Sequence, residues 1–330
     1  MVAPLFAEYE SRRPDPGVAM QRQIEVIGAA WGHGGADPGC AAAPALLAPL
    51  VRARLGECGV EALPGPILSS WPNERRKQLA VSRLCGQLAA AVADSLRGGR
   101  LPCVIGGDHS CAGGTWTGVV RALREKSGEK RSEQGAAALG LVWIDAHMDA
   151  HTPATSHTGR LHGMPLAWLL GQDDDPLYGL AAGVVEPQHV CLLGVRSFER
   201  EEQERLQRLG VRVIHMSEVA ERGVDATLEE AIGIASRGTD AYGISIDLDV
   251  IRPEEAPGVG TPVAGGIAGG ELARALARIG GGARLAAVEL VEYLPRLDRD
   301  GCSARVAVDL LAAALCGPRQ EAKVVADAVD

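Results

Sequence analysis

Short apolar runs alternate with longer amphipathic segments along most of the chain. Near-continuous apolar residues predict strands at 23–30, 60–63, 101–105, 141–144, 189–195, 211–215, 241–250 and 284–293. Apolar residues at helical spacing predict helices at 41–55, 73–97, 199–209, 226–236, 270–279 and 304–315. Because apolar strands that alternate with helices are typical of parallel sheets covered on both faces, we expect an α/β fold with a mainly parallel sheet.

Polar residues gather where these strands end. In LVWIDAHMDAH, at 141–151, four mostly apolar residues run into acid, His, acid and His at alternate positions. Alternate side chains of a strand share a face, so Asp145, His147 and Asp149 would converge on one point, or nearly so if the strand opens into a loop. One isolated Asp or His at such a place is more often a solvated polar residue. A convergent set indicates a metal site.

Two other strand ends repeat this arrangement. The strand at 101–105 leads into Gly-Gly-Asp-His-Ser, whose glycines let the backbone bend and bring His109 into a cleft. Asp247 and Asp249 alternate within the apolar strand 241–250. Burying both unpaired would cost on the order of several kcal/mol each, so a cation or strong donors must meet them, although loop capping would explain one. Ligands of parallel α/β sheets gather beyond the carboxyl ends of strands, where we expect these segments to meet.

The candidate ligands are four carboxylates and two imidazoles: His109, Asp145, His147, Asp149, Asp247 and Asp249. Such a set carries too much charge for one divalent ion and suits a pair of ions bridged by shared carboxylates. Its many oxygen ligands favour Mn²⁺. Two ions imply an activated bridging hydroxide. The sequence carries no evident redox site or organic-cofactor motif, so the expected chemistry is hydrolysis.

Length and composition narrow the class of protein. With 330 residues the chain can bury one large core, so we expect a single domain over 1–330. Hydrophobic residues make up 46% and charged residues 23%, as in ordinary soluble proteins. The net charge of −9 comes without a dense Lys/Arg field. That charge argues against nucleic acid or an anionic membrane as a partner and fits a cationic substrate better.

Cysteine usage and the N-terminal residues indicate the cellular compartment. The eight cysteines are scattered, form no Cys-x-x-Cys pair, and several lie in apolar runs, which is typical of buried thiols in a reducing compartment. Residues 1–13 carry acids and arginines without a long apolar run. We therefore expect no secretory signal, no membrane-spanning segment and a cytoplasmic location.

Three motifs together resemble those of a known family. Gly-Gly-Asp-His-Ser, Asp-Ala-His-x-Asp and Ser-x-Asp-x-Asp, in this order, are similar to the signatures of the arginase/agmatinase (ureohydrolase) superfamily, and most like a bacterial-type arginase. The resemblance extends from about residue 26 to residue 317. It implies one three-layer α/β/α domain of about eight strands, assembled as a homotrimer or homohexamer. It also implies two Mn²⁺ ions per chain, bridged by Asp145 and Asp247.

The resemblance also implies roles for residues around the ligands. Asp149 would act as acid and base beside the bridging hydroxide, and His162, in Leu-His-Gly-Met-Pro, would relay protons at the cleft mouth. Glu292, in Val-Glu-Tyr-Leu-Pro, would pair with the substrate guanidinium, a task suited to a carboxylate. A hydrogen-bonded loop histidine and a solvated glutamate are the alternatives for the last two. The residues expected to bind the rest of the substrate are His151, Thr158, Arg160, Glu199, Glu202 and Thr261.

Some positions depart from the family pattern. Arg252 and Leu294 precede prolines where Asp and Asn are usual. His151, Thr158 and Arg160 stand where arginases often place Asn, Ser and Asn. Glu199 falls where arginases carry the acid near the substrate's α-amino group, although a helix's first turn also favours acids. None of these residues is among the six candidate ligands, so the departures concern substrate contacts.

The sequence therefore predicts manganese-dependent hydrolysis of arginine to ornithine and urea. Arginine is favoured because an acid at Glu199 would accept an α-ammonium, while Thr158 and Arg160 would hold a carboxylate that agmatine lacks. Hydrolysis of agmatine, guanidinobutyrate or a formimino compound, as in a formimidoylglutamase, is the alternative within the family. A metal-binding homologue without catalysis is a further alternative, which the intact ligand set and His162 disfavour.

Overall fold

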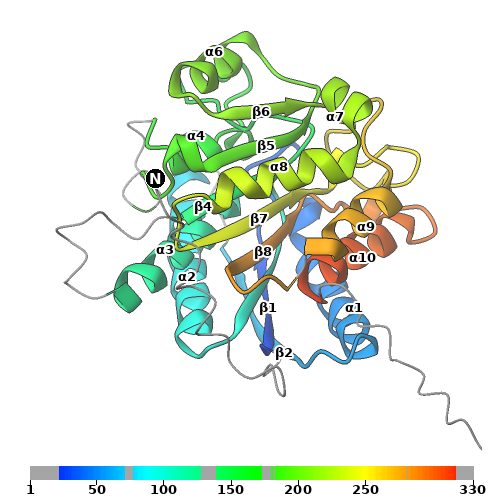
Figure 1. Ribbon diagram of the computed structural model, residues 1–330. Coiled ribbons are helices and arrows are strands. Elements are labelled where there is room, and N and C mark those ends of the chain that lie inside the picture. Colours follow the sequence, from blue (N-terminus) through cyan, green and yellow to red (C-terminus); the bar gives the residue numbers. More distant parts are fainter. Residues whose placement is uncertain are drawn as a thin grey trace, which may run out of the picture.

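One parallel sheet forms the centre of the molecule (Figure 1). The computed structural model describes residues 22–70, 77–127, 139–172, 180, 183–279 and 281–316. The eight strands run in the order β2-β1-β3-β8-β7-β4-β5-β6, and every neighbouring pair is parallel. The strands are β1 (Ile24–Ala30), β2 (Ala62–Ser69), β3 (Leu101–Gly106), β4 (Leu139–Ile144), β5 (Val190–Val195), β6 (Arg212–His215), β7 (Ala241–Asp247) and β8 (Leu285–Val291).

Helices cover both faces of the sheet and make three layers (Figure 1). One face carries α1 (Ala43–Glu57), α7 (Met216–Arg222), α8 (Val224–Ser236), α9 (Gly269–Ile279) and α10 (Cys302–Cys316). The other carries α2 (Lys77–Arg97), α3 (Ala112–Ser127), α4 (Pro165–Leu169) and α6 (Arg200–Leu209). Since alternate strand residues point to opposite faces, Val142 and Ile144 of β4 join the first core and Leu141 and Trp143 the second. The predicted α/β fold is confirmed.

The edge strand β2 differs most from the prediction. The sequence predicted a strand at 60–63, whereas β2 runs from Ala62 to Ser69 and passes through Pro64 and Pro66. A proline cannot donate a ladder hydrogen bond, so it is tolerated where only one neighbour pairs with the strand. β2 pairs with β1 alone, and their register shifts between Val26 and Gly28. The turn-like Pro-Gly-Pro sequence concealed this strand.

Two strands end earlier than predicted, and both turn into the candidate site. β7 stops at Asp247 and continues as the 3-10 turn η7 (Leu248–Val250), although the sequence predicted a strand to residue 250. β8 stops at Val291, and Glu292 has a φ of 65°. The helix α7 was not predicted. The predicted helix cap Asn73, residues 1–13 and most of the predicted loop at 126–134 lie outside the described residues, and α3 extends to Ser127.

Helix α2 is an exception to the expectation that no segment could span a membrane. It has 21 residues, and by length and apolar composition alone it could cross a membrane. Its side chains Val81, Leu84 and Leu88 are fully buried in the core. A long core helix needs the same apolar composition, so packing accounts for this feature of α2.

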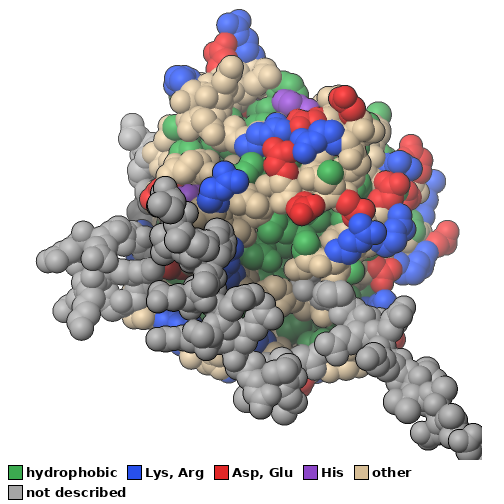
Figure 2. All heavy atoms as spheres, viewed as in Figure 1, with side chains coloured by type: hydrophobic (Ala, Val, Ile, Leu, Met, Phe, Trp, Pro, Cys, Tyr) green, Lys and Arg blue, Asp and Glu red, His purple; other side chains and the backbone are tan. Residues whose placement is uncertain are grey.

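Charges of both signs lie side by side on the surface. On the face drawn in Figure 2, Lys and Arg side chains are interspersed with Asp and Glu. Arg212, for example, reaches Glu218 at 2.5 Å and Glu230 at 2.8 Å. Exposed or half-exposed pairs of this kind contribute little to stability, about 0–1 kcal/mol each.

Candidate metal centre

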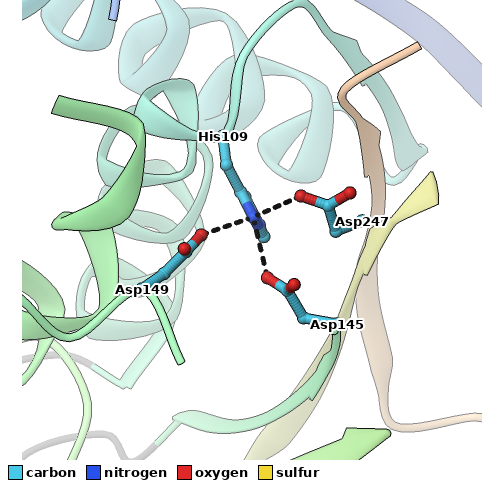
Figure 3. A group of neighbouring side chains, drawn as sticks. All are labelled: His109, Asp145, Asp149 and Asp247. Carbon is cyan, nitrogen blue, oxygen red and sulfur yellow. Dashed lines mark ion pairs between the residues drawn. The ribbon is translucent and has the colours of Figure 1, made fainter. Parts of the chain in front are cut away.

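Four side chains point toward one another at the carboxyl edge of the sheet (Figure 3). His109 follows β3, Asp145 and Asp149 follow β4, and Asp247 ends β7. The Nδ1 atom of His109 lies 2.9 Å from an Asp149 oxygen, and 3.3 Å from an oxygen of Asp145 and one of Asp247. All four side chains are buried. Three segments far apart in sequence thus meet as predicted.

A second group shares Asp145 with the first. The Nδ1 atom of His147 lies 3.1 Å from Asp249 and 3.6 Å from the Asp145 oxygen Oδ1, whereas Oδ2 of Asp145 faces the first group. Asp145, His147 and Asp149 therefore do not converge on one point. The chain leaves strand geometry after Ile144 and Asp149 has a φ of 50°, which separates Asp149 from His147. The six candidate ligands form two groups joined by one carboxylate.

Buried contacts orient the imidazole of His109. Its ring stacks on Trp143 with centroids 4.1 Å apart, and the Trp143 indole donates to Asp145 at 2.9 Å. On the far side, Nε2 of His109 lies 3.0 Å from the Ser245 hydroxyl, which donates to Glu289 at 2.8 Å. Because that hydroxyl hydrogen is directed to Glu289, the serine oxygen accepts from Nε2. Nδ1 then presents its lone pair to the carboxylates.

This donor set fits a divalent cation. Among the described residues the buried Nδ1 atom of His109 has no hydrogen-bond partner, although three carboxylate oxygens lie within 3.3 Å. Neighbouring ligands of one ion at metal–ligand distances of about 2.1 Å lie roughly 3 Å apart. Burial and the charge of Asp145 raise the pKa of Asp149 to about 6, and burial and Asp249 raise the pKa of Asp247. A cation in their midst would relieve this repulsion.

Hydrogen bonds hold the ligands at the end of β7 and in the turn after it. Asp247 accepts from the Asp249 backbone N–H at 2.9 Å, so it caps the next turn and faces His109 as well. The Thr261 hydroxyl donates to Asp249 at 3.0 Å. The Arg196 guanidinium donates to the carbonyl oxygens of Asp249 at 2.8 Å and of Val263 at 3.1 Å. The loop that carries Thr261 is thereby fastened to the end of β7.

His162 and Glu292 form a buried pair beside these groups. Nδ1 of His162 lies 2.9 Å from Glu292, and the same glutamate oxygen accepts from the His109 backbone N–H at 2.9 Å. Burial alone would lower the pKa of His162, but the charge of Glu292 outweighs it and raises that pKa to about 9. Burial opposes the ionisation of Glu292, but the charge and hydrogen bond of His162 favour it. The net result is a lowered pKa of Glu292. His162 lines a cavity of about 110 Å³ together with His147, Asp149, Asp247, Thr261 and residues of the loop at 156–158.

The remaining substrate-binding candidates lie farther out along this cavity. His151, Thr158, Glu199 and Glu202 line it. Glu199 caps α6, and Glu202, three residues later, bonds back to the Glu199 backbone at 3.1 Å. Arg160 instead lines an adjoining depression of about 510 Å³ with Thr158. The structure thus brings five of the six predicted substrate-binding residues, Thr261 included, to one cavity and places Arg160 beside it.

Several residues of the site were not found from the sequence. Glu289 is fully buried and carries a signal, a lone acid within the apolar strand LAAVELV. Asp108 lies inside the first motif, and its carboxylate accepts from the Gly34 backbone at 2.7 Å, which positions the glycine-rich loop after β1. Ser245 lies inside the third motif, but its bonds to His109 and Glu289 were not predicted, and no local sequence pattern identifies Arg196, which bonds to distant carbonyl oxygens.

Comparison with known proteins agrees with this geometry. The model of the Arginase family matches residues 22–317. The arginase of Brevibacillus brevis is 39% identical over 227 residues, which cover 68% of this chain and 72% of the relative. The arginase of Bacillus caldovelox is 38% identical over 238 residues, 72% of this chain and 75% of the relative.

Solved structures give the same result. The crystal structure of arginase from Bacillus cereus superposes with a TM-score of 0.81 at 32% identity, and the match covers 90% of this chain and 99% of that one. The match to the family model spans all six candidate ligands. This chain belongs to the arginase family.

Proposed function

We propose that this chain is a manganese-dependent hydrolase that converts arginine to ornithine and urea. The observation that carries the proposal is the position of Asp145, whose two oxygens face two separate ligand groups. One carboxylate shared between two groups is the arrangement of a dinuclear metal site. Relatives named arginases, which match more than two thirds of the chain, support the choice of substrate.

Each ligand group would hold one Mn²⁺ ion, the hard cation that an oxygen-rich site with few nitrogen ligands favours. When bound, such a pair lowers the pKa of a shared water and makes a nucleophile available near neutral pH. The residues that would hold the ions are His109, Asp145, Asp149 and Asp247 in one group and Asp145, His147 and Asp249 in the other, and we propose Asp247 as a second bridging carboxylate.

The protein's own side chains would position the substrate and move the protons. Glu292 would pair with the guanidinium once the substrate enters, in place of its present partner His162. In the reaction, water adds to the guanidino carbon. The bond between that carbon and the nitrogen attached to the alkyl chain breaks, and this leaving nitrogen gains a proton. Asp149 would take the proton that the water loses, and His162, which lines the cavity, would deliver a proton to the leaving amine.

The far end of the substrate would meet the outer part of the cavity. Glu199, whose side chain is half exposed, would accept hydrogen bonds from the α-ammonium. The buried Glu202 would hold Glu199 in place through its bond to the Glu199 backbone. Thr158 and Arg160 would meet the α-carboxylate from the adjoining loop. His151 would contact the same end of the substrate. Thr261, hydrogen-bonded to Asp249, would close the cavity beside the metal ligands.

A urea-release assay tests this proposal directly. Protein loaded with Mn²⁺ is given arginine, agmatine and guanidinobutyrate side by side, each at several concentrations. We expect the highest kcat/KM for arginine. A preference for agmatine or guanidinobutyrate would refute arginine as the substrate and leave a ureohydrolase. Absence of urea from all three would refute the ureohydrolase activity.

We further propose that the chain is one domain that assembles into a homotrimer or homohexamer in the cytoplasm. All eight strands of the described residues belong to one sheet, and all eight cysteines are free thiols, as expected in a reducing compartment. Light scattering coupled to size-exclusion chromatography should give the mass of three or six chains. The mass of one chain would contradict the assembly.

A further inference from the structure

A third cluster of ligand-type side chains lies at the rim of the cavity, apart from both metal-ligand groups. It consists of His151, Glu199 and Glu202, which place one nitrogen and two carboxylate oxygens within 4.8 Å of one another. The Nε2 atom of His151 lies 3.0 Å from the Glu199 oxygen and 3.3 Å from the Glu202 oxygen. His151 and Glu202 are buried, and Glu199 faces the cavity.

The other ring nitrogen of His151 is already occupied. Nδ1 lies 3.2 Å from the Thr155 hydroxyl, which accepts from the Thr152 N–H at 3.0 Å and lies 3.4 Å from the Thr152 carbonyl. A hydroxyl that donates its hydrogen to this carbonyl accepts from Nδ1. The other ring atom, Nε2, faces the glutamates. Histidines that bind metals almost always donate their second ring N–H to a fixed acceptor in this way.

Hydrogen bonds fix the buried carboxylate of Glu202 next to Glu199. Glu199 is the N-cap of α6, and Glu202 lies three residues later in the first turn of the helix. Glu202 uses one oxygen to accept from the Ala150 N–H at 2.9 Å and the other to accept from the Glu199 N–H at 3.1 Å. Each carboxylate oxygen has two lone pairs, which leaves one free on the oxygen nearest Nε2. Arg205 of α6 donates to the Ala150 carbonyl and fastens the His151 loop to the helix.

We propose that His151, Glu199 and Glu202 bind a third divalent metal ion of the class that combines imidazole with carboxylate ligands, Zn²⁺ being the best example. Zn²⁺ binds His nitrogens and Asp or Glu oxygens in proteins, and sites with three protein ligands keep a fourth position open to water. The two carboxylates balance the charge of the ion.

This site has a consequence for the enzyme that rests on the proposed function. The substrate's α-ammonium is itself a cation placed at Glu199, so the third ion and arginine compete for the same acids. Zn²⁺ should therefore raise KM for arginine more in the wild type than in His151→Asn. Binding of the ion itself is independent of turnover.

The test is a count of bound metal. Mn²⁺-loaded protein is dialysed against buffered Zn²⁺, and total metal per chain is measured by elemental analysis, which is insensitive to exchange between the two metals. The wild type should hold one more ion per chain than His151→Asn. Thr155→Val, which leaves all three ligands in place, should lower the affinity for the third ion by about 10–100-fold. His157→Asn is the matched control, because its ring lies 6.4 Å from that of His151 and belongs to none of the three ligand groups.

The outcomes separate the alternatives. Equal metal content in the wild type and His151→Asn would overturn the site and leave His151 as a hydrogen-bonding neighbour of the glutamates. Full affinity in Thr155→Val would equally contradict the fixed-ligand argument. If the urea assay fails while the wild type still holds the extra ion, the proposed function falls and the third site stands. Circular dichroism on each variant establishes that metal loss does not arise from unfolding.

Discussion

The floor and the rim of the cavity are built in different ways. The floor, defined as the six candidate ligands, comes from the ends of the central strands β3, β4 and β7, and five of its six residues are buried. The rim, defined as His151, Thr158, Arg160 and Glu199, comes from a loop and the N-cap of α6. Thr158 and Arg160 are exposed, and the Glu199 side chain is 50% exposed.

This difference separates reaction from specificity. All six floor positions match the family signatures, whereas His151, Thr158 and Arg160 of the rim depart from them. Floor side chains are held by contacts from several elements, so on the proposed function a change there should disturb binding of the two metal ions and the reaction. On the same proposal a rim side chain would meet the part of the substrate that does not react, so a change there should alter the choice of substrate. The following predictions test this division, from the largest expected effect to the smallest.

The largest effect should follow Asp145→Asn. The two ligand groups share this carboxylate, so its loss should remove at least one ion per chain and nearly all turnover, beyond the ~10²–10⁴-fold loss typical of one missing acid or base. Metal content and urea release measure the two effects. Asp225→Asn, an exposed acid on α8, is the control and should leave both unchanged. Two bound ions and a near-normal rate in Asp145→Asn would remove the basis for a dinuclear centre.

His162→Asn should separate proton transfer from metal binding. The imidazole lines the cavity and contacts Glu292 but belongs to neither ligand group of the floor. We expect normal metal content and a kcat lower by about 10²–10⁴-fold, the range typical of removed acid or base help. Steady-state kinetics and elemental analysis on the same sample measure both. Loss of metal would place His162 among the ligands instead.

Glu289→Gln should weaken metal binding without touching a ligand. Glu289 accepts from Ser245, which in turn accepts from His109, so the substitution disturbs the orientation of that imidazole. We expect metal affinity to fall by about 10–100-fold, as is typical for partners of metal ligands. Titration with Mn²⁺ followed by isothermal calorimetry measures the change. An unchanged affinity would mean that Trp143 stacking alone orients His109.

Glu199→Ala should change specificity more than rate. The half-exposed carboxylate would meet the α-ammonium, and a single interaction of about 1.4 kcal/mol corresponds to a tenfold effect. We expect kcat/KM for arginine to fall by about tenfold, and to fall less for a guanidino acid without the α-amino group. Kinetics with both substrates measure the ratio. Equal losses would limit Glu199 to its role at the start of α6.

The smallest effect should follow Arg160→Ala. This side chain is exposed and lines the depression next to the cavity, and exposed charges contribute about 0–1 kcal/mol, or less than about fivefold. We therefore expect a modest rise in KM for arginine and an unchanged kcat. A loss larger than that of Glu199→Ala would show that Arg160 reaches into the cavity when substrate binds.

Much of the floor could be predicted from the sequence because its signals are local. Asp145 and Asp247 each follow an apolar strand, and parallel strands bring their carboxyl ends to one edge. Three segments with the same pattern therefore predicted one site. The division of His147 and Asp149 between two groups was not predicted, since it depends on the positive φ of Asp149 in the loop.

Other features depend on contacts that no local pattern encodes. The edge strand β2 exists because β1 pairs with it, in spite of its two prolines. The chain from Glu289 through Ser245 to His109 joins β8, β7 and the turn after β3. Arg196 acts on carbonyl oxygens more than 50 positions away in the sequence. Such partners become evident only when the fold brings them together.

Anomalous scattering at the manganese edge, on crystals of the Mn²⁺-loaded protein, tests the central claim most directly. The account predicts two strong peaks per chain at the floor of the cavity. One should lie next to His109 and the other next to His147, with Asp145 contacting both. A single peak, or two peaks of which one lies away from Asp145, would contradict the dinuclear centre.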